Sequence, residues 1–208
     1  LGRMLADLAP DAAEVHGLLA LMALQASRTP ARLDGEGKPV LLMAQDRSQW
    51  DAVLIHSGLA ALTSADELAS AFAQPMGPYA LQAAIAACHA RAPTGDATDW
   101  RRIAALYDAL AQVAPSPVVE INRAVAVGMA FGPAAGLEVL DALASEKALK
   151  NYQWLPSVRG DLLAKLGRHD EARQEFERAA ALAGNARERE LLLARAQAAG
   201  QGVGDTLH

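Results

Sequence analysis

Apolar residues recur along most of the chain at intervals of three and four, the spacing of helices that bury one face. Residues 11–27 are an example, with Val15, Leu18, Leu19 and Met22 on one side of the predicted helix. Proline, glycine and capping residues separate this segment from similar ones that follow it. The pattern predicts an all-α chain in which successive helices form an array of antiparallel hairpins.

One segment interrupts the helical pattern. Asp34-Gly35 is a turn signal, and the apolar run at residues 39–43 is short enough for a strand. We therefore expect that the N-terminal part of the chain can hold a short β-hairpin. Farther on, Asp46 and Gln49 have the spacing of a capping box, which predicts that the next helix begins there.

A repeat is clearest near the C-terminus. Gly160, Leu163, Ala172, Phe176 and Ala179 follow the tetratricopeptide (TPR) pattern, in which small residues stand where two helices approach closely and large ones fill the space between them. This spacing predicts TPR-like helical hairpins.

The repeat that precedes it has two possible registers. A register based on Ala135 places Arg123 at the close-contact position of Gly160, which suits a large charged side chain poorly. A register based on Gly136 places the small residue Ala124 there instead. We prefer the second register for this reason.

These patterns divide the chain into three parts. Residues 76–198 are predicted to form a TPR-like α-solenoid. Residues 1–75 do not fit the repeat, and we expect a helical subdomain or the cap that such stacks need at their ends. Residues 199–208 are predicted to be a disordered tail. Because the sequence starts at Leu1 inside a predicted helix, we expect a piece of a longer protein.

Composition supports the helical interpretation and limits the partners. Hydrophobic residues make up 52% of the chain and aromatic residues 4%, so most of the apolar mass is Ala and Leu, which favour helices. The net charge is −5, and Lys and Arg are scattered, which argues against direct nucleic-acid binding by this chain. No apolar run reaches the length of a membrane span. We expect a cytoplasmic protein that does not contact membranes.

Residues with catalytic or metal-binding potential do not form a recognisable site. No two of the five histidines have the spacing of four that a helix uses to bind zinc. Cys88 and His89 are adjacent and point in different directions on a helix, and Cys88 lies in a segment that reads as packed core. We therefore predict no catalytic residue, no metal site and no cofactor, and a protein that is not an enzyme.

Residues 44–51 are richer in polar groups than their neighbours. In a structural interpretation, Asp46 caps a helix, Trp50 lies in the core and Arg47 forms a surface ion pair. In a functional interpretation, Asp46, Arg47 and Trp50 form a patch that binds a partner, since Trp and Arg are frequent at the centres of interfaces.

The helix predicted at residues 117–131 contains three polar side chains. Glu120 lies in its first turn, where the helix dipole favours a carboxylate. Asn122 and Arg123 are either buried and paired, or exposed in the concave groove that helix stacks offer to peptides. Further candidates for this groove are Asp161, Lys165, Tyr79, Gln82 and His89.

Several motifs together resemble one family. "QDRSQWD", "LQAAIAACHA" and "PSPVVEINRAVA" are distinctive, and the likeness extends over residues 1–198. The chain resembles the C-terminal, TPR-like extension of extracytoplasmic-function (ECF) sigma factors. The resemblance implies a bacterial regulatory domain that acts in transcription initiation through contacts with protein, either its own sigma regions or RNA polymerase. DNA would be bound only by regions absent from this sequence, since it contains no polymerase-binding or helix-turn-helix segment.

Two other functions fit the same sequence. One is a stand-alone TPR-type adaptor for an unrelated partner. The other is a helical domain that senses a small molecule in a pocket near His89 or Asp46.

Overall fold

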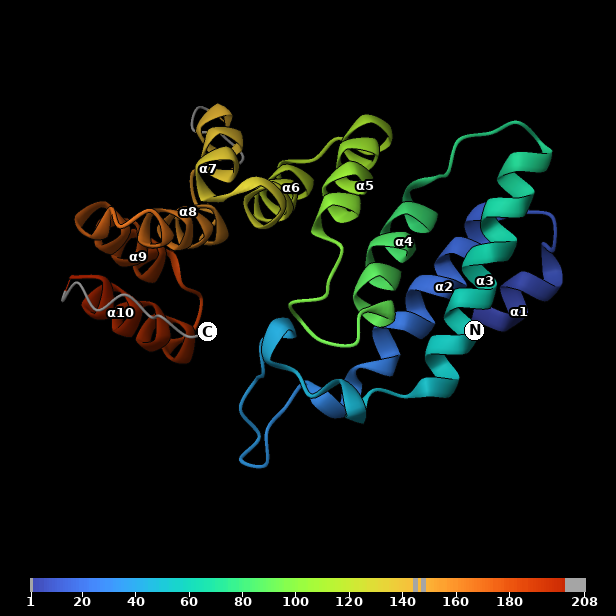
Figure 1. The fold of residues 1–208 in the computed structure, drawn as a ribbon, viewed down its shortest axis with the longest axis horizontal. Coiled ribbons are helices and arrows are strands. Elements are labelled where there is room, and N and C mark those ends of the chain that lie inside the picture. Colours follow the sequence, from blue (N-terminus) through green and yellow to red (C-terminus); the bar gives the residue numbers. More distant parts are fainter. Residues whose placement is uncertain (1, 144–145, 147–148, 201–208) are drawn as a thin grey trace. The chain divides into compact units, whose positions relative to one another are not determined.

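The structure is a computed structural model that describes residues 2–143, 146 and 149–200. Within these residues all regular structure is helical, and Figure 1 labels the α-helices in their order along the chain. The all-α prediction is confirmed. The helices are α1 (Gly2–Leu8), α2 (Ala13–Ser27), α3 (Ala52–Ala71), α4 (Pro78–Arg91), α5 (Trp100–Val113), α6 (Pro117–Phe131), α7 (Pro133–Ala142), α8 (Trp154–Lys165), α9 (His169–Leu182) and α10 (Ala186–Gly200).

The predicted β-hairpin is reduced to a turn with one bridge. The Asp34 carboxylate accepts hydrogen bonds from the backbone N–H groups of Glu36 and Lys38, so the turn is present. Only Leu33 and Pro39 form a β-bridge, and Leu42–Ala44 is a 3-10 turn. The prediction of a strand at residues 39–43 is therefore wrong. An isolated pair of strands is marginal in water, and this loop is mostly exposed.

The predicted capping box is also wrong. The Asp46 carboxylate accepts a hydrogen bond from the Ser48 N–H and caps only the 3-10 turn Arg47–Gln49. The Gln49 amide donates to the Asp46 side chain instead of bonding its backbone N–H. α3 begins farther on, at Ala52, where the Asp51 carboxylate accepts from two backbone N–H groups.

The chain divides into two compact units, one ending at Ala114 and one beginning at Pro115. This division differs from the predicted boundary at residues 75–76, because α4 packs against α2 as well as against α5. The C-terminal boundary also differs, since Ala199 is buried and belongs to α10. The rest of the predicted tail, residues 201–208, lies outside the described residues.

In the first unit, α2 packs against α1, α3 and α4. Gly17 of α2 lies so close to α4 that an added Cβ atom would stand 2.6 Å from the Ala80 nitrogen. Small side chains fill the crossing between these helices, and they form a core with leucines from α2 and α3. The buried members of that core are Ala20, Leu24, Ala61, Leu62, Ala83, Ala84 and Ala87.

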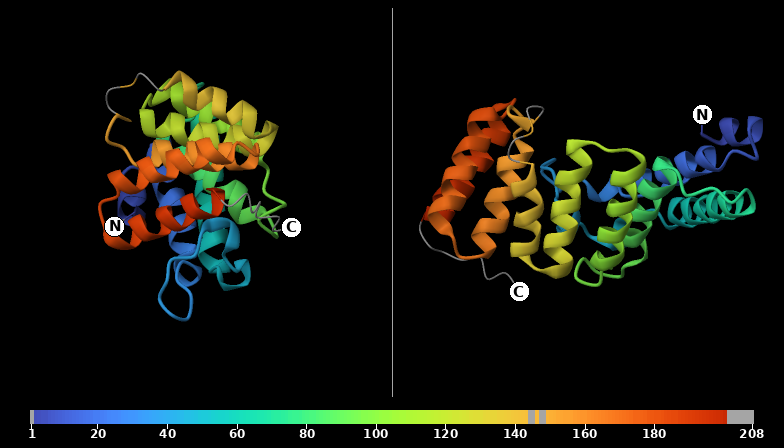
Figure 2. Two further views of the ribbon diagram at one scale, coloured as in Figure 1. Left: turned by 90° about the vertical axis from the view of Figure 1, so that its left-hand side faces the viewer. Right: turned by 90° about the horizontal axis from the view of Figure 1, so that it is seen from above.

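The second unit has the repeat packing that the sequence predicts. α6 pairs with α7 and α8 with α9, α10 packs on α9, and the helices lie side by side (Figure 2). A Cβ atom at Gly160 would stand 2.8 Å from the Phe176 ring, and one at Gly136 would stand 2.7 Å from the Ala124 carbonyl oxygen. The preferred register, based on Gly136, is therefore confirmed.

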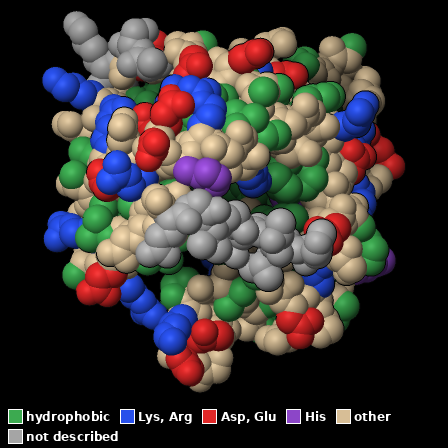
Figure 3. Space-filling view, turned by 60° about the vertical axis from the view of Figure 1, so that its left-hand side comes forward, with side chains coloured by type: hydrophobic (Ala, Val, Ile, Leu, Met, Phe, Trp, Pro, Cys, Tyr) green, Lys and Arg blue, Asp and Glu red, His purple; other side chains and the backbone are tan. Residues whose placement is uncertain are grey.

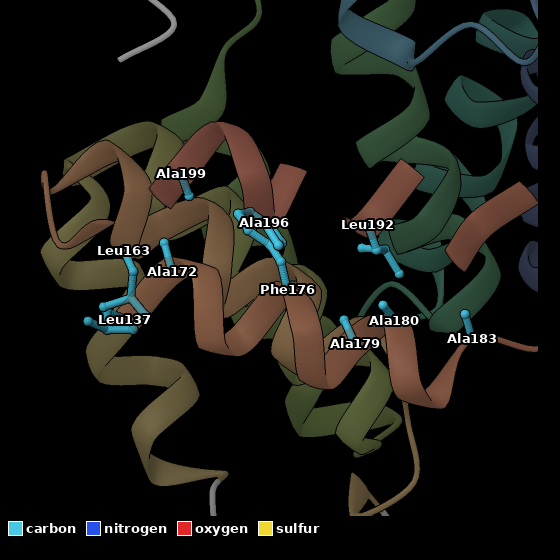
Figure 4. Close-up of a cluster of buried hydrophobic side chains, with 10 residues drawn as sticks. All are labelled: Leu137, Leu163, Ala172, Phe176, Ala179, Ala180, Ala183, Leu192, Ala196 and Ala199. Atoms are coloured by element: carbon cyan, nitrogen blue, oxygen red, sulfur yellow. The ribbon is translucent and has the colours of Figure 1, made fainter. Parts of the chain in front are cut away.

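A continuous apolar core joins the last four helices of this unit. Figure 4 shows its side chains, which come from α7, α8, α9 and α10. Four residues of the TPR pattern belong to it, namely Leu163, Ala172, Phe176 and Ala179, each at most 2% exposed. The same residues that gave the repeat its signature therefore hold the hairpins together.

Candidate functional site

Both ends of α4 are bound by charged side chains from distant parts of the first unit. At its N-terminus, the Glu14 carboxylate accepts hydrogen bonds from the backbone N–H groups of Tyr79 (2.9 Å) and Ala80 (3.0 Å). At its C-terminus, the Arg47 guanidinium donates to the carbonyls of His89 and Ala92. Each charge has the sign that the helix dipole favours at that end. α4 is thereby fixed along its axis.

The predicted patch at residues 44–51 is part of this arrangement. Trp50 is buried, as the structural interpretation predicted, and the Arg47 guanidinium lies 4.9 Å from the centre of its indole ring. The guanidinium of Arg28 lies over the same ring at 5.8 Å. The predicted surface ion pair of Arg47 is wrong, because its partners are backbone carbonyls and the Thr98 hydroxyl. Asp46 is exposed at the neighbouring 3-10 turn.

A pocket of about 190 Å³ opens next to this cluster, and we call it the His89 pocket. One wall comes from α2 and the residue that follows it, and another from α4, with further contributions from α5 and the 3-10 turn Leu42–Ala44. On α2 and on α4 the lining positions follow helical spacing, so each helix presents one face. The lining residues are Leu21, Gln25, Arg28, Leu42, Gln82, Ile85, Ala86, His89 and Tyr107.

His89 is the most buried polar group of this pocket. It is 8% exposed, and its ring packs edge-on against Trp100 with 5.3 Å between the centroids. Its Nδ1 atom is buried and has no hydrogen-bond partner within the described part of the chain. Burial, followed by the charges of Arg47 and Arg28, lowers the pKa of His89 to about 4. The imidazole is therefore neutral at pH 7.

Two other residues of α4 have different surroundings. Cys88 is buried, and burial raises the pKa of its thiol, which fits the prediction that it packs as a small apolar residue. Tyr79, a predicted groove residue, is 44% exposed and does not line the His89 pocket. Gln82, predicted with it, does line the pocket.

The remaining predicted groove residues lie in the second unit. Asn122 is exposed, whereas Arg123 donates from Nε to the Glu120 carboxylate at 2.9 Å. Asp161 of α8 forms an ion pair with Arg195 of α10. The local pairing considered for Arg123 is thus present, while Asn122 is not buried.

A face of α6 and α8 carries exposed apolar side chains. The offset that aligns Ala124 with Gly160 also aligns Val118 with Trp154, which are 43% and 50% exposed. It aligns Met129 with Lys165 as well, and the Lys165 Nζ atom lies 3.6 Å from the Met129 sulfur. By helical spacing, this face includes three of the predicted groove residues, Asn122, Asp161 and Lys165, but not Arg123. We call it the repeat face; its members are Val118, Asn122, Met129, Trp154, Asp161 and Lys165.

Charge on the molecule is mixed in sign. On the surface seen in Figure 3, Lys and Arg side chains lie among Asp and Glu side chains, without an extended patch of one sign. Several charged side chains of the described residues form ion pairs, for example Arg168 with Glu171 and Arg159 with Glu175. This surface offers no basic stripe that would follow a nucleic-acid backbone.

The sequence named some members of the His89 pocket but not their grouping. Gln82, His89, Arg47 and Trp50 were candidates in two separate surfaces, and the structure brings them into one region of the first unit. Arg28 was missed. Arg28 has helical spacing from Leu21 and Gln25 of α2, so the sequence could have placed it on the same face of that helix. Only the packing of α2 against α4 shows which residues lie opposite this face. Members of the pocket that sequence reasoning missed are Leu21, Gln25, Arg28, Leu42, Ile85, Ala86 and Tyr107.

Fold and site define an all-α protein of stacked helix hairpins with a polar pocket in one unit and a partly apolar repeat face in the other. Residues 1–66 match a family of unknown function (DUF6596). An uncharacterized protein of Rhizobium meliloti (strain 1021) is 47% identical over 188 residues, which cover 90% of this chain. The chain spans 43% of that relative's length. No solved structure gives a significant match. No described helix is both long and apolar enough to cross a membrane.

Proposed function

We propose that this chain is a regulatory, protein-binding part of an ECF sigma factor and acts in transcription initiation. The motifs quoted above support the family, and the Rhizobium relative is compatible with it, because more than half of that protein lies outside the matched segment. In this proposal the chain contacts the sigma regions or core RNA polymerase. The contact shifts the population of the active sigma conformation.

The observation that carries the proposal is the composition of the repeat face. Val118, Met129 and Trp154 are each at least 38% exposed, and they lie among polar side chains that include Asn122 and Lys165. Helix stacks commonly bind extended segments on such a surface. Exposed apolar groups bordered by polar ones are typical of protein interfaces. The net charge of −5 favours a basic partner segment, such as a promoter-reading region.

The first test measures binding by the complete 208-residue chain. One partner is core RNA polymerase, and the other is the part of the Rhizobium relative that lies outside the match. We expect a complex with at least one of them, with a Kd in the micromolar range or below. The absence of both complexes at micromolar concentrations would contradict the proposal and favour the stand-alone adaptor.

A pair of variants locates the contact. Val118→Ser changes the repeat face, and Val53→Ser removes an equally large apolar side chain that is 76% exposed on α3. We expect Val118→Ser to raise the Kd of the complex by about tenfold and Trp154→Ser to raise it more. Val53→Ser should leave the Kd unchanged. Equal effects of the two valine variants on the Kd would contradict the assignment of the binding surface to the repeat face. Circular dichroism verifies that each variant remains folded.

A further inference from the structure

The His89 pocket has an excess of positive charge. Arg28 lines it, and no Asp or Glu is among its lining residues. Within the described residues, Arg28 hydrogen-bonds to the Gln25 amide oxygen (2.6 Å) and forms no ion pair. Burial and the nearby charges of Arg32 and Arg47 all lower the pKa of Arg28, so no carboxylate offsets them. A buried or half-buried charge without a counter-charge favours binding of an anion.

The polar groups of the pocket also have unused hydrogen-bonding capacity. The buried Nδ1 atom of His89 has no partner among the described residues, and an unpartnered buried polar atom is costly. Burial raises the pKa of Tyr107, so its phenol remains a neutral hydrogen-bond donor. Arg28 has further N–H groups besides the one that contacts Gln25. The residues that carry these groups come from three different helical segments and line the same cavity, although the Nδ1 atom of His89 is not itself exposed to it.

Apart from Gln25 and Gln82, the rest of the lining is apolar, and the cavity limits the size of a ligand. Leu21, Ile85 and Ala86 form a hydrocarbon wall on α2 and α4. The volume of about 190 Å³ corresponds to roughly six water molecules at ~30 Å³ each. A ligand of about six to ten non-hydrogen atoms fits this space. A free phosphate would leave the apolar wall uncovered.

We propose that the His89 pocket binds a small organic carboxylate, with its charged group on Arg28 and its hydrocarbon part against the wall formed by Leu21, Ile85 and Ala86. A guanidinium accepts a carboxylate in a bidentate geometry, which orients the ligand. The Tyr107 phenol then donates a further hydrogen bond, and the neutral His89 ring forms part of the wall. This site is independent of the repeat face and of the proposed contact with the transcription machinery, since all its residues lie in the first unit.

The test is calorimetric titration of the complete chain with three probes at millimolar concentrations. Benzoate has the charge and size that the pocket favours, benzamide is its neutral counterpart, and inorganic phosphate is an anion without a hydrocarbon part. We expect saturable binding of benzoate, at least about tenfold weaker binding of benzamide, and no binding of phosphate. Equal binding of benzoate and benzamide, binding of phosphate alone, or no saturable binding would each overturn the proposal.

Matched variants test the location. Arg28→Gln removes the pocket's guanidinium, and Arg91→Gln makes the same charge change at an exposed position at the end of α4. We expect the first to weaken benzoate binding at least about tenfold and the second to leave it unchanged. Ala86→Met fills the pocket while keeping every charge, and should also abolish binding. Unchanged affinity in either Arg28→Gln or Ala86→Met, with folding verified by circular dichroism, contradicts the site.

Discussion

The two units are both built from helix hairpins, but their helices are held together in different ways. In the second unit, a small residue faces the partner helix at each of two successive hairpins: Gly160 of α8 faces the Phe176 ring of α9, and one repeat earlier Gly136 of α7 faces the Ala124 carbonyl of α6. In the first unit, Gly17 faces backbone atoms of α4. There, Glu14 and Arg47 bind the ends of α4 from far along the chain. One unit relies on repeated local packing, the other on single non-local contacts.

This difference determines what each unit leaves accessible. Repeated packing turns equivalent positions of successive repeats to the same side. Exposed residues such as Val118 of α6 and Trp154 of α8 therefore form one face. In the first unit, the packing of α4 against α2 and α5 brings unlike groups together once and leaves a cavity with a neutral His89 and a charged Arg28. The repeat face therefore suits an extended protein segment, and the pocket a small molecule.

The largest expected effect compares a glycine that faces backbone in the first unit with one that faces a side chain in the second. Gly17→Ala places a Cβ atom 2.6 Å from the Ala80 nitrogen, and backbone cannot turn away. Gly160→Ala places one 2.8 Å from the Phe176 ring, which can shift. Overpacking costs about 1–3 kcal/mol, and the better helix propensity of Ala offsets up to about 1 kcal/mol. We expect Gly17→Ala to lower the free energy of unfolding by about 2 kcal/mol and Gly160→Ala by about 1 kcal/mol or less.

Urea unfolding followed by far-UV circular dichroism measures both variants. Amide hydrogen exchange then assigns the loss to one unit, because it reports local stability. A larger loss for Gly160→Ala than for Gly17→Ala would contradict the prediction, because it would mean that the Phe176 ring cannot shift while the crossing of α2 and α4 can.

The sequence predicted the second unit better than the first, and packing explains why. Its repeat depends on residues close together in sequence, so Gly160, Ala172 and Phe176 reveal it, and Gly136 even identifies the register. In the first unit, the partner of Arg47 is a helix end more than forty residues away. No local pattern encodes that contact, and none encodes the packing of α2 against α4 that assembles the pocket.

The next prediction concerns the pocket's electrostatics. His89 has a pKa of about 4 in the folded chain and about 6.5 when unfolded. Between these values the unfolded state binds more protons than the folded state. The contribution of the neutral His89 to the free energy of unfolding is therefore fully present above about pH 6.5 and is lost as the pH falls towards 4. From about pH 7.5 to pH 5 this lowers the free energy of unfolding by about 2 kcal/mol.

His89→Gln removes this dependence, and His56→Gln, at an exposed position of α3, serves as its control. Urea unfolding at the two pH values gives the stability of each protein. The other titratable groups are common to all three and cancel in the difference. If His89→Gln kept the pH dependence of the parent chain, the lowered pKa of His89 could not be its cause, and the prediction would be wrong.

A smaller effect is expected from the C-terminal contact of α4. Arg47→Met keeps an apolar stem beside Trp50 but removes the donors to the carbonyls of His89 and Ala92. Charge-assisted hydrogen bonds contribute about 1.5–3 kcal/mol when buried, and Arg47 is only half-buried, so we expect a loss of about 1.5 kcal/mol. Thermal and urea unfolding measure it, with Arg91→Met as the control. Equal losses in Arg47→Met and Arg91→Met would mean that the hydrogen bonds from Arg47 to the carbonyls of His89 and Ala92 do not contribute to the free energy of unfolding.

The smallest effect is expected at the other end of the same helix. Glu14→Gln keeps one acceptor oxygen but replaces the other with an amide group, so one of the two hydrogen bonds to the N–H groups of Tyr79 and Ala80 is lost. Loss of the charge also weakens the interaction with the helix dipole, and together we expect about 1 kcal/mol. Glu67→Gln, exposed within α3, is the control. Hydrogen exchange at Tyr79 and Ala80 should accelerate about fivefold in Glu14→Gln alone. Unchanged exchange there would place the restraint on α4 in the Gly17 packing instead of in its charged ends.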